Sequence, residues 1–364
     1  MFTLLARAMY RWRRVVLILA AGFLVFAGVW GIGAFGALAS GGFEDPESES
    51  FRANAALESA LGRSGADVVV VYAHDTETVD SPAFERSVVD TLAALPSSEV
   101  ESVDGFWSTG SEGFVSEDRR STYAVLQLSG EDEDVRAEQV TDLEAALDAP
   151  GLSEQVGGQA TVDRDINEQV AEDIARAELL SQPILMVLLL IIFGGLAAAS
   201  MPLVIGAFAV LGAFTVIRVL TLVTDVSVFA INIVIFLGLG LAIDYGLFIV
   251  SRFREELHAG RDVPTALTRT LQTAGRTVAV SGTIVAISLS GLLLFPQNFL
   301  RSMGLGGIAA VVVAMVAALT VLPALLAVLG PRIDSLSVRP LLRRLAPRRR
   351  TESSGPGAWE RIAR

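Results

Sequence analysis

Long apolar stretches separated by polar segments divide the chain, and six of them are long enough to cross a membrane. A transmembrane helix needs about 20 mainly apolar residues. The first predicted span covers residues 15–38. The other predicted spans cover residues 183–199, 202–222, 226–250, 274–295 and 303–329. The pattern therefore predicts a polytopic α-helical membrane protein with six spans, five of them in a bundle at 183–330.

The segment before the first span alternates arginines with apolar residues. Such a basic amphipathic segment is expected to lie on an anionic membrane surface. The apolar run that follows is longer than the ~7–15 residues of a signal-peptide core. We therefore interpret residues 1–39 as a basic N-terminus and an uncleaved membrane anchor.

Residues 40–182 contain no run long enough to span a membrane, and charges and turn residues are frequent, which predicts a separate soluble domain. A short run of valines predicts a strand at 67–73, the following pattern predicts further strands at 99–107, 121–130 and 152–156, and helical periodicity predicts helices at 82–95 and 134–147. This βαββαβ order is the split arrangement of a ferredoxin-like α+β sandwich. A long polar helix at about 161–181 then leads to the second span.

Arginine is concentrated in the segments that a six-span topology places on one side of the membrane. Residues 251–273 begin with Arg252 and Arg254, which mark the water interface, and nine arginines follow Pro331. The positive-inside rule places such segments in the cytoplasm. We therefore expect a plasma-membrane protein with both termini in the cytoplasm, a basic tail at 331–364, and residues 40–182 outside.

Composition removes several classes of function. The chain is 52% apolar with a net charge of −12, and residues 40–182 contain 32 acids against eight arginines, which favours solubility and argues against nucleic-acid binding. The chain has no cysteine, so disulfides and thiolate metal sites are excluded. It also has no lysine, which excludes an ATP-binding loop of the Gly-Lys type. We expect neither a cofactor nor a metal.

One acid, Asp244, lies within the apolar run at 226–250. A charged side chain at the bilayer centre costs about 2.5–3.5 kcal/mol on insertion scales, so such a residue is a functional candidate. Tyr245 supplies a phenol that can donate to the carboxylate. Gly238 and Gly240 precede it and are small enough for another helix to approach. The alternative is that Asp244 is a hydrogen-bonding residue that only holds helices together.

These residues belong to a series of motifs that resembles the MMPL (mycobacterial membrane protein large) branch of the resistance-nodulation-division transporters. The resemblance covers the whole chain. Its most specific segments are residues 224–232, 238–256, 274–277 (Ala-Gly-Arg-Thr), 295–301 (Phe-Pro-Gln-Asn-Phe-Leu-Arg) and 322–325 (Leu-Pro-Ala-Leu).

The resemblance implies a proton-driven exporter of lipids or other amphiphiles, with the soluble domain as a porter. It implies that Asp244 and Tyr245 form a proton relay and that Ser281 faces this relay. The alternative for Ser281 is a hydroxyl bonded to the preceding turn of its own helix.

Full members of the family resemble two similar halves with twelve spans and two relay pairs, whereas this chain matches one half. Residues 359–364 repeat the pattern of residues 2–7, where a second half is expected to open. Three explanations stay open: a second half on another polypeptide, a homodimer, or a truncated product. The expected partners are a lipid or amphiphile, protons, membrane lipids, and a second half-transporter or second copy, with sites at the repeat interface.

Two other functions compete with transport. An intramembrane aspartyl protease needs two carboxylates that share a proton, but Asp225 lies at the membrane edge and no second acid is buried in a span, so we expect no enzyme. His74 and His258 lie in soluble segments on opposite sides of the predicted membrane. A non-transporting regulatory or scaffolding subunit, or an inactive truncated transporter, stays as the alternative function.

Overall fold

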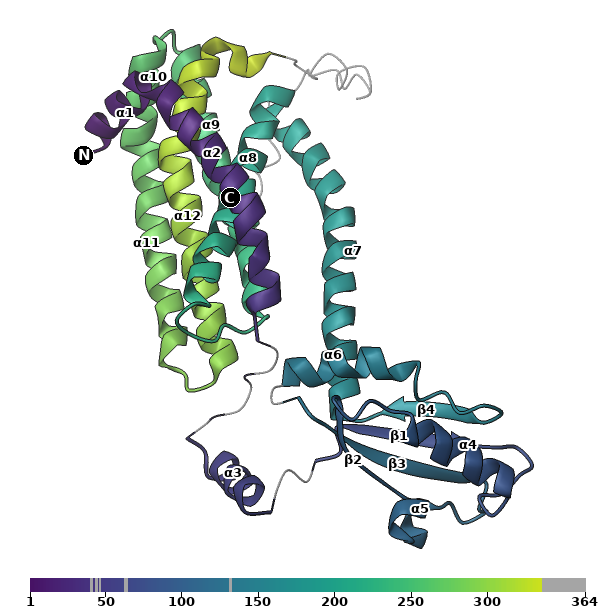
Figure 1. Ribbon diagram of the computed structural model, residues 1–364. Coiled ribbons are helices and arrows are strands. Elements are labelled where there is room, and N and C mark those ends of the chain that lie inside the picture. The colour runs from purple at the N-terminus through teal and green to yellow at the C-terminus, as the bar shows by residue number, and fades with distance from the viewer. Residues whose placement is uncertain (40–41, 43–44, 46, 62–64, 131–132, 336–364) are drawn as a thin grey trace, which may run out of the picture.

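A bundle of long helices and a smaller α+β domain are joined by one helix, α7 (Gln159–Phe193) (Figure 1). The computed structural model describes every residue except 40–41, 43–44, 46, 62–64, 131–132 and 336–364. Most of the expected basic tail, including the repeated pattern at 359–364, therefore lies outside the described residues.

Five helical segments in the described part of the chain are long and apolar enough to cross a membrane. The first three are α2 (Arg13–Trp30) with the 3₁₀ helix η1 (Gly31–Ala37), α8 (Leu196–Leu220) and α9 (Ala230–His258). The fourth segment, Val263–Leu294, contains α11 (Arg276–Ser290) and the 3₁₀ helix η4 (Gly291–Leu294), and the fifth, Asn298–Asp334, begins with α12 (Asn298–Leu329). Small residues such as Ala209, Ala242 and Ala314 fill the common core. Small side chains let helix backbones approach closely where no water drives association.

The predicted second span, at residues 183–199, has the wrong boundaries. α7 is one helix of 35 residues that contains both the expected polar helix and an apolar part, Leu179–Phe193, which is shorter than the five spans. It ends at Gly194, whose φ of 65° stops the helix, and α8 begins at Leu196. The predicted boundaries follow the prolines, because a proline is a typical signal for the first turn of a helix. Pro183 and Pro202 lie inside helices, which membrane helices tolerate because neighbouring groups satisfy the freed backbone.

The smaller α+β domain, which the sequence predicts to be soluble and which we call the soluble domain, is a four-stranded antiparallel sheet with two helices on one face. The strands are β1 (Val68–Ala73), β2 (Val100–Gly105), β3 (Ser121–Leu128) and β4 (Ser153–Gly157), in the spatial order β2-β3-β1-β4. Apolar residues of α4 (Pro82–Ala93) and α6 (Glu133–Glu144) share one core with alternate residues of β1 and β3. The predicted order of strands and helices is confirmed.

Local sequence explains the start of several elements. Ser81 accepts a hydrogen bond from the Ala83 amide and Pro82 occupies the first turn of α4, a favoured helix start. Four consecutive valines, which pack well on a pleated surface, begin β1. Two short helices were not predicted: α3 (Glu49–Leu61) and α5 (Phe106–Thr109).

The N-terminal segment forms a helix, α1 (Phe2–Arg11), at the same end of the bundle as α10 (Val263–Thr270) (Figure 1). α1 lies against α10 and α12, and Gln272 Nε2 donates to Thr3 Oγ1 at 2.9 Å. The predicted surface helix at 251–273 is thus divided: α9 continues to His258, and α10 follows after a turn.

Candidate functional site

Asp244 lies in the middle of α9, on the side that faces away from the bundle core. Phe236, Gly240, Asp244 and Phe248 follow one another at intervals of four residues and are all exposed. Residues at this spacing lie on one face of a helix. We call these four residues the open face of α9. The opposite face packs into the core through residues such as Ala242 and Ile249, which are fully buried.

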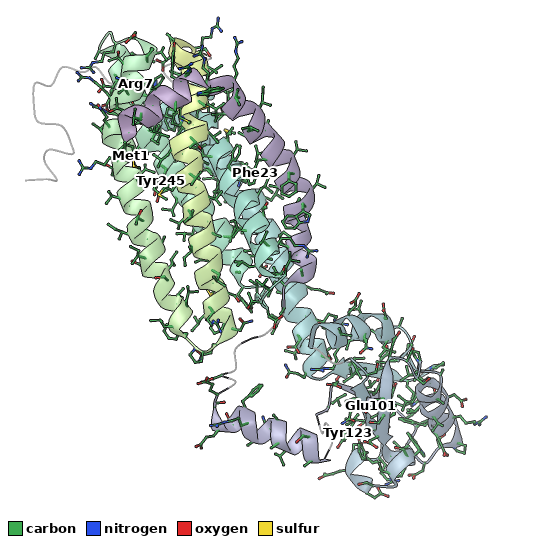
Figure 2. The ribbon with its side chains drawn as sticks, turned by 60° about the vertical axis from the view of Figure 1, so that its left-hand side comes forward. Met1, Arg7, Phe23, Glu101, Tyr123 and Tyr245 are labelled. Carbon is green, nitrogen blue, oxygen red and sulfur yellow. The ribbon has the colours of Figure 1, made fainter. Side chains whose placement is uncertain are left out.

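Tyr245 is adjacent to Asp244 in sequence but points into the bundle (Figure 2). Its side chain is 3% exposed, and its hydroxyl group has no hydrogen-bond partner among the described residues. The hydroxyl lies beside α11, 3.2 Å from the position that a Cβ atom on Gly282 would occupy. The expected hydrogen bond from Tyr245 to Asp244 is not formed, because successive side chains of an α-helix point about 100° apart.

Ser281 of α11 is half-buried close to the Tyr245 hydroxyl group. Its own Oγ donates to the Val278 carbonyl oxygen at 3.2 Å, which is a bond within its own helix. This is the alternative anticipated for a serine in a membrane helix. The structure thus brings Ser281 to Tyr245, and the hydrogen bond of its hydroxyl goes to Val278. The relay role of Asp244, Tyr245 and Ser281 stays a prediction.

The two glycines before Asp244 have different surroundings. Gly238 is buried, and a Cβ atom there would lie 3.5 Å from Ala310 Cβ of α12, so this residue packs α9 into the bundle. Gly240 belongs to the open face, and a Cβ atom there would meet nothing within 4 Å. Gly240 is therefore the glycine that leaves room beside the acid.

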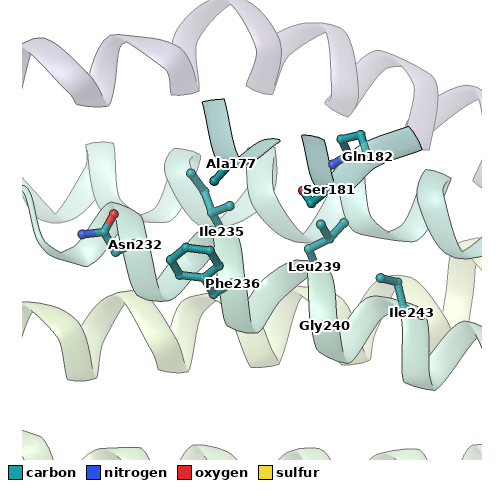
Figure 3. A pocket seen from close by; sticks show the side chains of 9 residues that line it. All are labelled: Ala177, Ser181, Gln182, Asn232, Ile235, Phe236, Leu239, Gly240 and Ile243. Carbon is teal, nitrogen blue, oxygen red and sulfur yellow. The ribbon is translucent and has the colours of Figure 1, made fainter. Parts of the chain in front are cut away.

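A cavity of about 280 Å³ lies between α7 and α9 (Figure 3). Nine residues line it: Ala177, Ser181 and Gln182 from α7, and Asn232, Ile235, Phe236, Leu239, Gly240 and Ile243 from α9. The cavity is mostly apolar, with a few amide and hydroxyl groups. The sequence analysis did not predict this cavity. The polar residues Ser181 and Gln182 at the start of an apolar run were a signal that could have indicated it.

A second, more open hollow of about 720 Å³ lies between α9 and α11, toward the C-terminal end of α9. Phe248 of the open face borders it, together with Ser251, Glu255 and Thr277. Along α9, Asp244 thus lies between the residues that line the two hollows, and both hollows are mainly apolar.

The charged residues that end α9 make ordered contacts, although the sequence indicated only a water interface. Glu256 is 1% exposed and pairs with Arg252 at 2.5 Å and with Arg261. Arg254 is paired with Asp334, at 2.6 Å, and His258 Nε2 lies 3.2 Å from the same carboxylate. No short-range pattern in the sequence points to Asp334 as the shared partner.

Comparison with known proteins identifies the family of this chain. The sequence profile of the MMPL family matches residues 43–364. The chain belongs to the MMPL family. Together with the five apolar helices, this membership makes it a multi-pass membrane protein.

Several proteins are similar to this chain over most of its length. The trehalose monomycolate exporter MmpL3 of Mycobacterium tuberculosis is 36% identical over 351 residues, which are 94% of this chain and 37% of that protein. The membrane protein SCO6666 of Streptomyces coelicolor is 39% identical over 346 residues, which are 93% of this chain and 48% of that protein. This MMPL chain therefore spans less than half the length of these relatives.

A third relative matches a shorter stretch. The mycolic acid-containing lipids exporter MmpL11 of Mycolicibacterium smegmatis is 42% identical over 173 residues, which are 48% of this chain and 18% of that protein. The family resemblance expected from the motifs is confirmed.

Proposed function

We propose that this chain supplies one helix bundle and one porter domain of a proton-driven exporter of lipids or other amphiphiles, in which Asp244 binds and releases the proton. The observation that carries the proposal is the place of Asp244: it is exposed on the open face of α9, midway along an apolar membrane helix. A carboxylate held against hydrocarbon is costly, whereas a neutral carboxylic acid is much less so. The position thus favours a group that changes its protonation state.

The open face also supports the need for a second bundle. In the working transporter, a similar bundle packs on the open face of α9 across a pseudo-twofold axis, with Gly240 leaving room for its approach. Transporters built from repeats place their coupling-ion sites at such interfaces near the bilayer midplane. The second bundle would supply the partner that Asp244 lacks among the described residues.

The soluble domain serves as the porter and lies outside the cell. Its βαββαβ order and its antiparallel strand order β2-β3-β1-β4 support a ferredoxin-like sandwich. The acidic domain and the basic loops support an extracytoplasmic domain and cytoplasmic termini. The relatives named as exporters of trehalose monomycolate and of mycolic acid-containing lipids support an amphiphilic cargo.

The test is export of a labelled amphiphile by the full transporter in proteoliposomes with an imposed proton gradient. Asp244→Asn keeps the shape and hydrogen bonding of the side chain but cannot carry a proton, so gradient-driven export is expected to fall to background with expression unchanged. Asp225→Asn is the matched control, because Asp225 is an exposed acid in the loop before α9 and should keep full export. Full export by Asp244→Asn would rule out the relay and favour a scaffolding role.

A further inference from the structure

Among the described elements, α7 is the helix that continues from the soluble domain into the bundle (Figure 1). It follows β4 through Gly158 and contacts α6 near this end, while Leu189 and Phe193 are buried in the bundle core at the other. Between these ends, Leu180, Ile184 and Leu188 are at least half exposed, and the cavity of Figure 3 separates α7 from α9. α7 is thus packed against other elements near both of its ends. The cavity between them leaves room for α7 to change its tilt relative to α9.

A charged side chain of α9, Arg254, binds the C-terminal end of α7. Arg254 Nη1 donates to the carbonyl oxygen of Phe193, the last residue of α7, at 2.8 Å. Arg254 Nη2 pairs with the Asp334 carboxylate, just after α12, at 2.6 Å. The last carbonyl groups of a helix lack partners within it and attract a cation. Because the Arg254 side chain is only 13% exposed, these charge-assisted bonds are shielded from water.

The neighbouring arginines have a different role. Arg252 and Arg261 pair with Glu256, which belongs to α9 itself, so they hold the end of α9 and the turn after it. Neither makes a bond to α7 in the described structure. Arg254 is therefore distinguished from these two charges by its bond to another segment.

Arg254 and Asp244 belong to the same unbroken helix, ten residues apart. At 1.5 Å per residue this is about 15 Å along the axis. A displacement of α9 that begins at Asp244 carries Arg254 with it. The carbonyl that Arg254 holds belongs to the residue directly before Gly194, whose left-handed backbone ends α7 and provides a hinge.

We propose that Arg254 is a positioning residue that couples α9 to α7, so that a shift of α9 on protonation of Asp244 tilts α7 and moves the soluble domain. This inference rests on the proposed role of Asp244 as a proton carrier. It assigns to Arg254 the transmission of that event, and no contact with proton or cargo.

The test measures the position of α7 rather than export. Cysteines replace Glu172, exposed on α7, and Leu294, 86% exposed at the end of η4, and are spin-labelled in the otherwise cysteine-free chain. Pulsed electron paramagnetic resonance of the full transporter in nanodiscs, at one pH, gives the distance between the labels. Asp244→Asn, which mimics the protonated acid, is expected to shift this distance by about 1–2 Å, the usual size of helix shifts.

Adding Arg254→Gln should abolish the shift, so that the label distance is the same with and without the Asp244→Asn substitution. Arg261→Gln is the matched control: it removes the same charge from the same end of the bundle without touching α7, and it should keep the shift. Asp334→Asn should keep it as well, because the bond from Arg254 to Phe193 remains. An undiminished shift in Arg254→Gln, or no shift with Arg254 present, would overturn the proposal.

Two further measurements separate the possible failures. If Arg254→Gln does not fold, Arg254→Met is used: its unbranched side chain has no donor for the Phe193 carbonyl oxygen, so the shift is expected to be lost. An unchanged shift in this variant counts against the coupling. If the label distances change as expected but the transporter exports no amphiphile, the proposed function is wrong and the coupling through Arg254 is supported. If export requires Asp244 but the shift in label distance does not depend on Arg254, only the proposed coupling is wrong.

Discussion

Asp244 and Tyr245 are consecutive residues of α9, yet Asp244 is exposed on the open face and Tyr245 is 3% exposed in the bundle core. The two groups therefore do not form a hydrogen-bonded pair within this chain. Tyr245 faces Ser281 and Gly282 of α11, whereas Asp244 faces the side on which we propose a second bundle. Each residue would thus meet a different partner in the assembled transporter.

Tyr245→Phe is expected to lower gradient-driven export less than Asp244→Asn does, because it removes a hydroxyl and leaves the carboxylate. It should not lower stability, since the buried hydroxyl has no hydrogen-bond partner among the described residues and its removal leaves no other group unpaired. Tyr72→Phe is the contrast: it leaves the Leu147 carbonyl, now bonded at 2.9 Å, without a donor and should cost about 1 kcal/mol or more. Thermal unfolding and vesicle export check both. Complete loss of export in Tyr245→Phe would contradict the smaller role.

Topology is tested by labelling single cysteines in intact cells with an impermeant maleimide. Ser111→Cys, in the soluble domain, should be labelled, and Ala259→Cys, in the turn after α9, should be labelled only after lysis. Both positions are exposed, and the chain has no native cysteine to compete. The charge asymmetry across the membrane is the physical reason. The reverse pattern of labelling would show that the orientation is wrong.

Cross-linking tests whether a second bundle covers the open face of α9. A cysteine at Phe248 is expected to form products with another bundle in native membranes. A cysteine at Ile18 on α2, 70% exposed, is the control and should form none, because it is expected to face lipid. Self-linked products would indicate a homodimer, and products with a different six-span protein would indicate a split transporter. Full export with no cross-linked product at Phe248 would contradict the second bundle.

Gly158→Ala should destabilise the junction between β4 and α7. Gly158 has a φ of 118°, and a Cβ atom there would lie 2.5 Å from the Asp67 carbonyl oxygen. The strained backbone alone costs about 1–3 kcal/mol. Gly157→Ala is the matched control, because an added Cβ atom at that position meets nothing within 4 Å. A lower unfolding temperature is expected for Gly158→Ala only, and equal temperatures for the two variants would disprove the strain.

Much of the architecture could be predicted because it depends on local patterns. The apolar runs predicted all five long spans, and the run of valines from Val68 to Val71 predicted the first strand, since each pattern is visible in a few neighbouring residues. The family could also be predicted from the motifs around Asp244. The continuity of α7 could not, because a proline such as Pro183 is a typical signal for the start of a helix.

By itself, the sequence determined the apolar helices, the order of strands and helices in the soluble domain, and the acid within α9, because periodicity and charge are properties of short segments. Only the tertiary structure decided which way these elements face. Asp244 and Tyr245 are equivalent in the sequence pattern, and packing against α8 and α12 buries one and exposes the other. Arg254 reaches Phe193 and Asp334 because folding brings residues far apart along the chain to one end of the bundle, and no local pattern contains that information.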